Sequence, residues 1–156
     1  MSDTENIATQ TEQSGPTKQV VPISKLWWVG LIALLVASIG SVIFFFITKS
    51  LFDIPYIIPL GGPDGPLGLL PIPAIFILSG AGTIGATILL AILGKFVSRP
   101  FRMFWIISFI VFLLSFILPV TLPDTVAMRT VIGLGAMHVI GLVLIVGILT
   151  MMGRKK

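Results

Sequence analysis

Four long stretches of this chain contain no Asp, Glu, Lys or Arg, and this pattern constrains the fold more than any other feature. The stretches are residues 26–48, 67–94, 103–123 and 130–153. A helix needs about 20 apolar residues to cross the roughly 30 Å hydrocarbon core of a bilayer, and each stretch is long enough. The pattern therefore predicts an integral membrane protein that crosses the bilayer four times.

The composition favours helices over barrel strands as the spanning elements. Of the 156 residues, 56% are hydrophobic and 10% are charged, whereas soluble domains have about 25% charged residues. Within lipid, only helices and closed barrels satisfy every backbone N–H and C=O, and barrel strands alternate apolar and polar residues. Because runs such as 31–36 and 106–114 are apolar nearly throughout, we predict an all-α protein with a four-helix transmembrane bundle. The predicted spans are about residues 26–48, 71–94, 101–118 and 127–152.

The distribution of charge predicts the orientation. Eight of the ten Lys and Arg residues fall before the first span, between the second and third, or after the fourth. Only Lys49 and Arg129 fall on the other side, where Asp53, Asp64 and Asp124 accompany them. The positive-inside rule then places both termini in the cytoplasm and the chain in the plasma membrane as a multi-pass protein. Anionic lipid at the inner surface, not nucleic acid, is the expected partner of the basic groups.

The remaining segments divide the chain simply. Residues 1–24 are polar and are predicted to form a disordered cytoplasmic tail. Residues 25–153 are the membrane domain, and residues 154–156 are a basic cytoplasmic end. The first apolar run is too long for a cleaved signal peptide and is expected to remain as an anchor. The Pro- and Gly-rich loop at 50–70 is apolar, so we expect it to lie along the outer interface.

The two later connections are short and limit the packing. Residues 95–100 and 119–126 leave room only for tight turns, so the second, third and fourth spans should be consecutive antiparallel neighbours. Pro119 and Pro123 are expected to end the third span.

His138 is the only histidine and the only ionisable side chain deep within a predicted span. Ionisable groups inside membranes are functional candidates. Counted at 1.5 Å per residue, Ser79 and Ser41 fall at a similar depth, and Thr83 shares a helical face with Ser79. We therefore predict a polar intramembrane site made of His138, Ser79, Thr83 and Ser41, in which His138 faces the interior and hydrogen-bonds another helix. Tight helix packing and a functional site both remain open as explanations.

The sequence offers no other chemistry, and we predict no catalytic, cofactor-binding or metal-binding residue. There are no cysteines, and no Asp or Glu lies inside a span, where a proton relay would use one. A Ser79–His138 dyad lacks the glycine that intramembrane serine proteases carry two residues before the serine. A haem bound by His138 would need a second ligand, from another subunit or from a methionine such as Met137.

The second half of the chain carries a family resemblance. An Arg-Pro-x-Arg loop at 99–102 is followed by Ser115 before the Pro119 turn, and the last span contains Met137, His138 and Val139. Over about residues 26–152 the chain resembles the uncharacterised four-span bacterial membrane proteins grouped as domain of unknown function family 6069. The resemblance implies a four-helix membrane bundle and no particular activity.

Three function classes follow. The first is a non-enzymatic structural or accessory subunit of a larger assembly or homo-oligomer. The alternative is a small transporter or channel-like protein with a polar midplane site around His138. The third is a membrane-embedded enzyme or haem protein.

Overall fold

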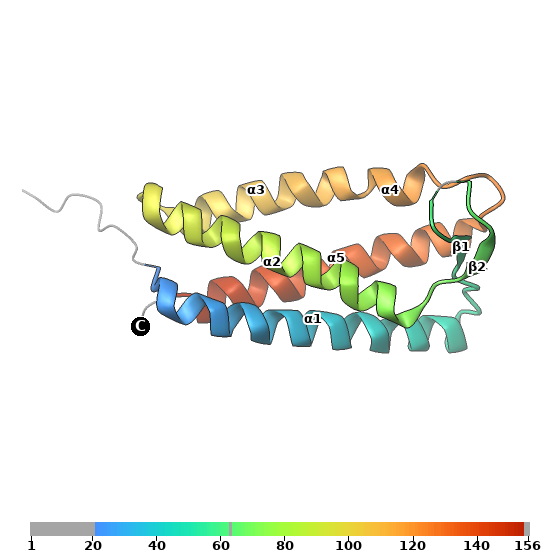
Figure 1. Ribbon diagram of the computed structural model, residues 1–156, viewed down its shortest axis with the longest axis horizontal. Coiled ribbons are helices and arrows are strands. Elements are labelled where there is room, and N and C mark those ends of the chain that lie inside the picture. Colours follow the sequence, from blue (N-terminus) through green and yellow to red (C-terminus); the bar gives the residue numbers. More distant parts are fainter. Residues whose placement is uncertain (1–20, 63, 155–156) are drawn as a thin grey trace, which may run out of the picture.

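The computed structural model describes residues 21–62 and 64–154, and within them the chain is mostly helical (Figure 1). The elements, in chain order, are α1 (Ile23–Leu51), β1 (Ile57–Pro59), β2 (Leu67–Leu69), α2 (Ile72–Phe96), α3 (Pro100–Ser115), α4 (Ile117–Val120) and α5 (Met128–Met152). Most of the predicted tail, residues 1–20, and the last two residues of the predicted basic end lie outside the described residues.

Three of the helices are long and apolar enough to cross a membrane: α1, α2 and α5. Each begins and ends within a few residues of a predicted span, because the charged and proline residues that border the apolar runs also border the helices. Pro71 precedes α2 in an extended conformation, and Pro73 occupies its first turn, where a missing N–H costs nothing. The membrane-protein prediction therefore agrees with the helices that the chain forms.

The third predicted span is interrupted, which corrects the sequence-based boundary at 101–118. α3 has 16 residues and stops at Ser115, and the 4-residue α4 carries the chain on to Val120. Pro119 has no N–H for the carbonyl of Ser115, four residues earlier, and its ring crowds that carbonyl. Pro119 therefore breaks the helix one turn before itself instead of ending it.

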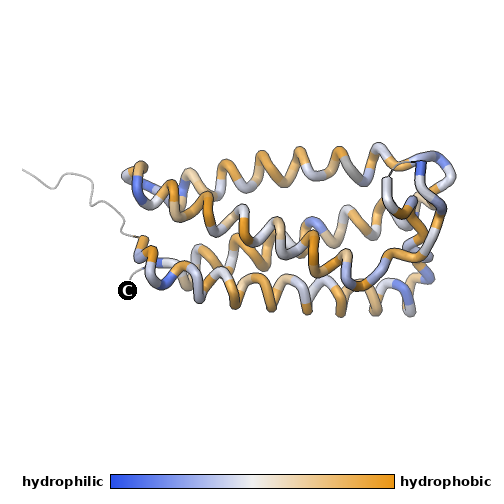
Figure 2. Tube along the Cα trace, in the orientation of Figure 1, coloured by the Kyte–Doolittle hydropathy of each residue, from blue (hydrophilic) through white to orange (hydrophobic). Residues whose placement is uncertain are grey.

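The helices lie lengthwise in one bundle (Figure 1). α1 packs against α2 and α5, and α3 packs against the same two helices from the other side. The start of α1 and the end of α5 lie at one end, together with the α2–α3 turn; we call this the basic end, after Lys25, Lys95, Arg99, Arg102 and Arg154. The strands and the α4–α5 loop lie at the other, the hairpin end. Figure 2 shows hydrophobic residues along the helices and hydrophilic ones gathered mainly at the two ends.

The interior holds two apolar clusters, one toward each end. Toward the basic end, Ala33 and Ala37 of α1, Leu90 of α2, Phe104 of α3 and Leu149 of α5 are all fully buried. Small residues allow close contact: a Cβ on Gly30 of α1 would lie 2.8 Å from Oγ1 of Thr87 on α2. Lipid offers no hydrophobic drive between helices, so such close packing supplies much of the association energy.

The loop after α1 contains secondary structure that the sequence analysis did not predict. β1 and β2 form a two-stranded antiparallel hairpin in which Ile57 pairs with Leu69 and Pro59 with Leu67. Before the hairpin, Asp53 and Tyr56 adopt positive φ angles of 51° and 48°, which turn the chain back over the bundle. The segment therefore forms a hairpin at one end of the bundle (Figure 1), and its location along the outer interface stays a prediction.

Candidate functional site

His138 forms its hydrogen bond within its own helix. Its Nδ1 lies 2.8 Å from the carbonyl oxygen of Leu134, one turn earlier on α5. Because a carbonyl oxygen can only accept, Nδ1 carries the proton, and in the neutral ring Nε2 keeps a lone pair. The half-buried ring also lies 6.1 Å, between centroids, from Phe116 at the break between α3 and α4.

The three predicted partner hydroxyls do not bond to His138. Thr83 donates to the carbonyl of Ser79 at 2.7 Å, so these two residues are joined along α2. Ser41 is buried, with 3% of its surface exposed. Among the described residues no hydrogen bond connects His138 with any of the three, and the predicted interhelical bond is wrong. A backbone carbonyl one turn earlier can accept the hydrogen bond of a polar side chain in the same helix. This local acceptor competes with partners on neighbouring helices, which must also lie at the same depth.

Other hydroxyls inside the helices follow the same pattern. Thr87 donates to the carbonyl of Thr83 at 2.8 Å, and Thr150 donates to that of Val146 at 2.7 Å. Ser38 and Thr130 differ, because each has a buried hydroxyl oxygen with no hydrogen-bond partner among the described residues. Several polar side chains of the long helices thus bond to the backbone of their own helix.

The polar contact that joins two segments of the chain is one that the sequence did not predict. Tyr56, just before β1, is fully buried, and its hydroxyl lies 2.6 Å from Oγ1 of Thr48 near the end of α1. Thr48 also donates to the carbonyl of Phe44 at 2.7 Å, so with its single proton used there the tyrosine is the donor. Burial raises the pKa of Tyr56 above its ordinary value. The phenol therefore stays protonated at neutral pH and can donate.

A glycine in α5 makes room for this tyrosine. A Cβ on Gly133 would lie 2.9 Å from the Tyr56 hydroxyl oxygen and 3.1 Å from two ring carbons. The Phe45 ring of α1 covers the other side, with 4.7 Å between ring centroids. One tyrosine thus connects the hairpin with α1 and α5; the sequence signal was the chain's single Tyr, set in the proline-rich loop.

Beside Tyr56 lies a mostly apolar pocket of about 590 Å³. Its lining residues come from the end of α1, the following loop and the first turns of α5: Phe44, Thr48, Phe52, Ile54, Arg129, Ile132, Gly133 and Ala136. Arg129 is its one charged residue. The pocket suits an apolar chain better than a polar substrate.

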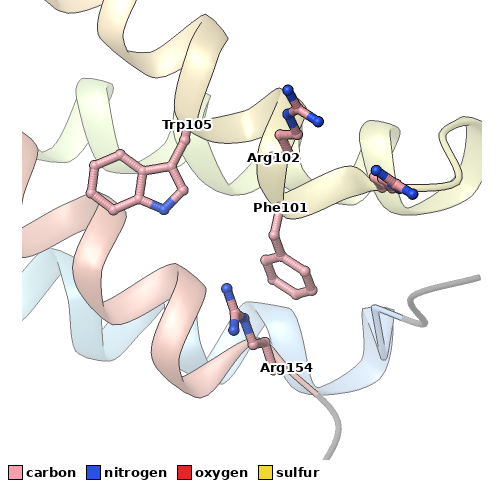
Figure 3. A pocket seen from close by; sticks show the side chains of 5 residues that line it. Phe101, Arg102, Trp105 and Arg154 are labelled. Atoms are coloured by element: carbon pink, nitrogen blue, oxygen red, sulfur yellow. The ribbon is translucent and has the colours of Figure 1, made fainter.

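A second pocket, of about 330 Å³, lies at the basic end. It is lined by Arg99, Phe101, Arg102, Trp105 and Arg154. Figure 3 shows Phe101 and Trp105 of α3 above the side chain of Arg154, which follows α5. The arrangement brings cationic and aromatic groups together and suits an anion with an apolar attachment.

The described residues contain no group of three or more His, Cys, Asp or Glu that could hold a metal ion. In the comparisons with known proteins, the model of DUF6069, described as a family of unknown function, matches residues 21–154. No curated protein and no solved structure matches the chain.

Proposed function

The chain belongs to DUF6069, a family of unknown function, and we propose that it acts as a non-enzymatic structural or accessory subunit of a larger membrane assembly or homo-oligomer. The observation that supports this role is the direction of the polar side chains within the helices. His138, Thr83 and Thr87 bond to carbonyls of their own helices. A catalytic or transport site needs several polar groups that converge on one substrate.

The proposal includes a topology of four spans in a bacterial plasma membrane, with both termini in the cytoplasm. α3 and α4 together supply 20 helical residues, which at 1.5 Å per residue extend about 30 Å, the thickness of the hydrocarbon core. Five of the described Lys and Arg residues lie at the basic end, which supports a cytoplasmic location for that end.

The lipid-facing surface supports association with other helices. Large apolar side chains are exposed along α2 and α3, including Ile77 and Leu78 on the former and Val111 and Leu114 on the latter. In addition, a Cβ on Gly85 of α2 would meet no other atom within 4 Å, so the backbone of another helix could approach there.

The test is the mass of the protein extracted from its native membrane in mild detergent. We expect a complex of fixed stoichiometry, heavier than one 16.8 kDa chain, that forms again when its purified components are mixed. A single chain that concentrates a solute in liposomes would contradict this role and favour the transporter alternative around His138. A Soret absorption band would instead favour the haem-protein alternative, with His138 as a ligand.

A further inference from the structure

We propose that the pocket at the basic end is a binding site for the phosphate group of an anionic phospholipid. Three of its five lining residues are arginines, from two separate parts of the chain: Arg99 and Arg102 at the start of α3, and Arg154 after α5. The planar guanidinium group matches phosphate oxygens with two parallel N–H donors, which a lysine cannot do. The proposal goes beyond a subunit role and does not depend on it.

Within the part of the chain that the structure describes, no carboxylate pairs with these arginines. All three acidic residues in the described part of the chain, Asp53, Asp64 and Asp124, belong to the hairpin end. The positive end of the α3 dipole adds to the arginines' field, since α3 starts at Pro100 and no side chain caps it. Among the described residues the charge around this pocket is therefore positive, which favours an external anion.

One arginine is held in place by an aromatic ring. The Arg154 guanidinium carbon lies 5.2 Å from the centroid of Phe101, within the range of a cation–π contact. Phe101 is only 4% exposed, so its ring is fixed in the apolar cluster. In Figure 3 the side chain of Arg102 extends away from Arg154; Arg102 is exposed, so its long side chain can change rotamer and turn toward an anion held at Arg154.

The depth of the pocket favours a lipid over a phosphate ion in solution. Trp105, which lines it, is 47% exposed, and Trp27 and Trp28 are 59% and 54% exposed at the same end. Exposed tryptophans gather at the level of lipid headgroups. The volume of about 330 Å³ is at the small end of ligand pockets, which range over about 300–1,000 Å³. A headgroup fits in it, while the acyl chains would lie against the apolar surface of α3.

The experiment measures how strongly the lipid prefers this pocket. The protein carries Trp27→Phe and Trp28→Phe, so that Trp105 is the only tryptophan, and it is placed in phosphatidylcholine nanodiscs. Phosphatidylglycerol with brominated acyl chains is added, and quenching of Trp105 is compared with that by brominated phosphatidylcholine. We expect phosphatidylglycerol to quench at a lower mole fraction, by roughly tenfold, as charge-assisted hydrogen bonds predict.

Two double variants, each lacking two positive charges, distinguish a specific binding site from general electrostatic attraction to anionic lipid. Arg102→Gln with Arg154→Gln removes two pocket cations, while Lys25→Gln with Lys95→Gln removes two cations of the same end that do not line the pocket. The first pair should abolish the preference and the second should keep most of it. Equal losses in both, or no preference in the parent protein, would overturn the proposal. Displacement of brominated phosphatidylglycerol by millimolar inorganic phosphate alone would overturn it in favour of the free ion.

Discussion

The hydrogen bond between Tyr56 and Thr48 should hold the hairpin against the bundle, and the two side chains should be strongly coupled. In Tyr56→Phe the ring stays and Thr48 keeps its bond to the Phe44 carbonyl. Only an acceptor loses its partner, and the cost should be about 0.5–1.5 kcal/mol. In Thr48→Val the buried tyrosine hydroxyl is left without an acceptor, which costs about 1–3 kcal/mol.

The double variant gives the sharper result. When Thr48→Val and Tyr56→Phe are combined, neither hydroxyl remains to lack a hydrogen-bond partner. The double variant should therefore be more stable than the Thr48→Val variant. Tyr56→Ala removes a fully buried ring and should cost about 3–5 kcal/mol. Thr87→Val is a matched control, because the Thr87 hydroxyl bonds only to its own helix at Thr83 in the described part of the chain. It should cost less than Thr48→Val.

The assay needs one local and one global readout, because the hairpin can open while the helices stay folded. Hydrogen–deuterium exchange of the peptide covering residues 52–70 reports opening of the hairpin. Unfolding in sodium dodecyl sulfate, followed by circular dichroism, reports the stability of the bundle. If the two single substitutions are strictly additive, so that the double variant is less stable than either, the inferred donor and acceptor roles are refuted.

Three further outcomes are expected. Gly133→Ala should destabilise the protein by up to about 2 kcal/mol, because crowding Tyr56 costs about 1–3 kcal/mol and the higher helix propensity of alanine offsets about 1 kcal/mol. In Gly141→Ala the new Cβ would meet no atom within 4 Å, so this control should not be destabilised in the same unfolding assay. Pro119→Ala should join α3 to α4, because residue 119 gains an N–H for the Ser115 carbonyl; slow amide exchange at 119 would show it, and fast exchange would contradict it. Burial raises the pKa of Tyr56 above its ordinary 10.0, so the folded state favours the protonated phenol. The hairpin should therefore be fully stable below about pH 10 and should open faster as the pH rises further. Tyr56→Phe should abolish this pH dependence.

The helices could be predicted from the sequence because the physics is local. An uncharged apolar run about 20 residues long has few alternatives to a helix that crosses a membrane. The break after Ser115 was predictable from the sequence for the same reason, because a proline disrupts the hydrogen bond to the carbonyl four residues before it. The sequence argument placed the effect of Pro119 at the proline itself and therefore missed the break by one turn.

The polar contacts were harder to predict because they depend on how separate segments meet. Counting residues placed His138 at the same depth as Ser79 and Ser41. The depth alone does not show whether His138 bonds to a neighbouring helix or to the carbonyl one turn earlier in its own helix. Tyr56 is buried through positive φ angles at Asp53 and Tyr56 itself, conformations that non-glycine residues seldom adopt and that composition does not reveal. The pocket at the basic end could not be predicted without knowing that Arg154, near the end of the chain, contacts Phe101 of α3.

Whether α3 and α4 cross the bilayer decides the proposed four-span topology, and the absence of cysteine from the chain makes this directly measurable. Single cysteines are introduced as Ser98→Cys, in the turn between α2 and α3, and as Asp124→Cys, between α4 and α5. Each variant is treated with a membrane-impermeant maleimide, first in intact cells and then after permeabilisation. We expect position 124 to be labelled in intact cells and position 98 only after permeabilisation; labelling of both positions in intact cells would show that the α3–α4 segment does not cross.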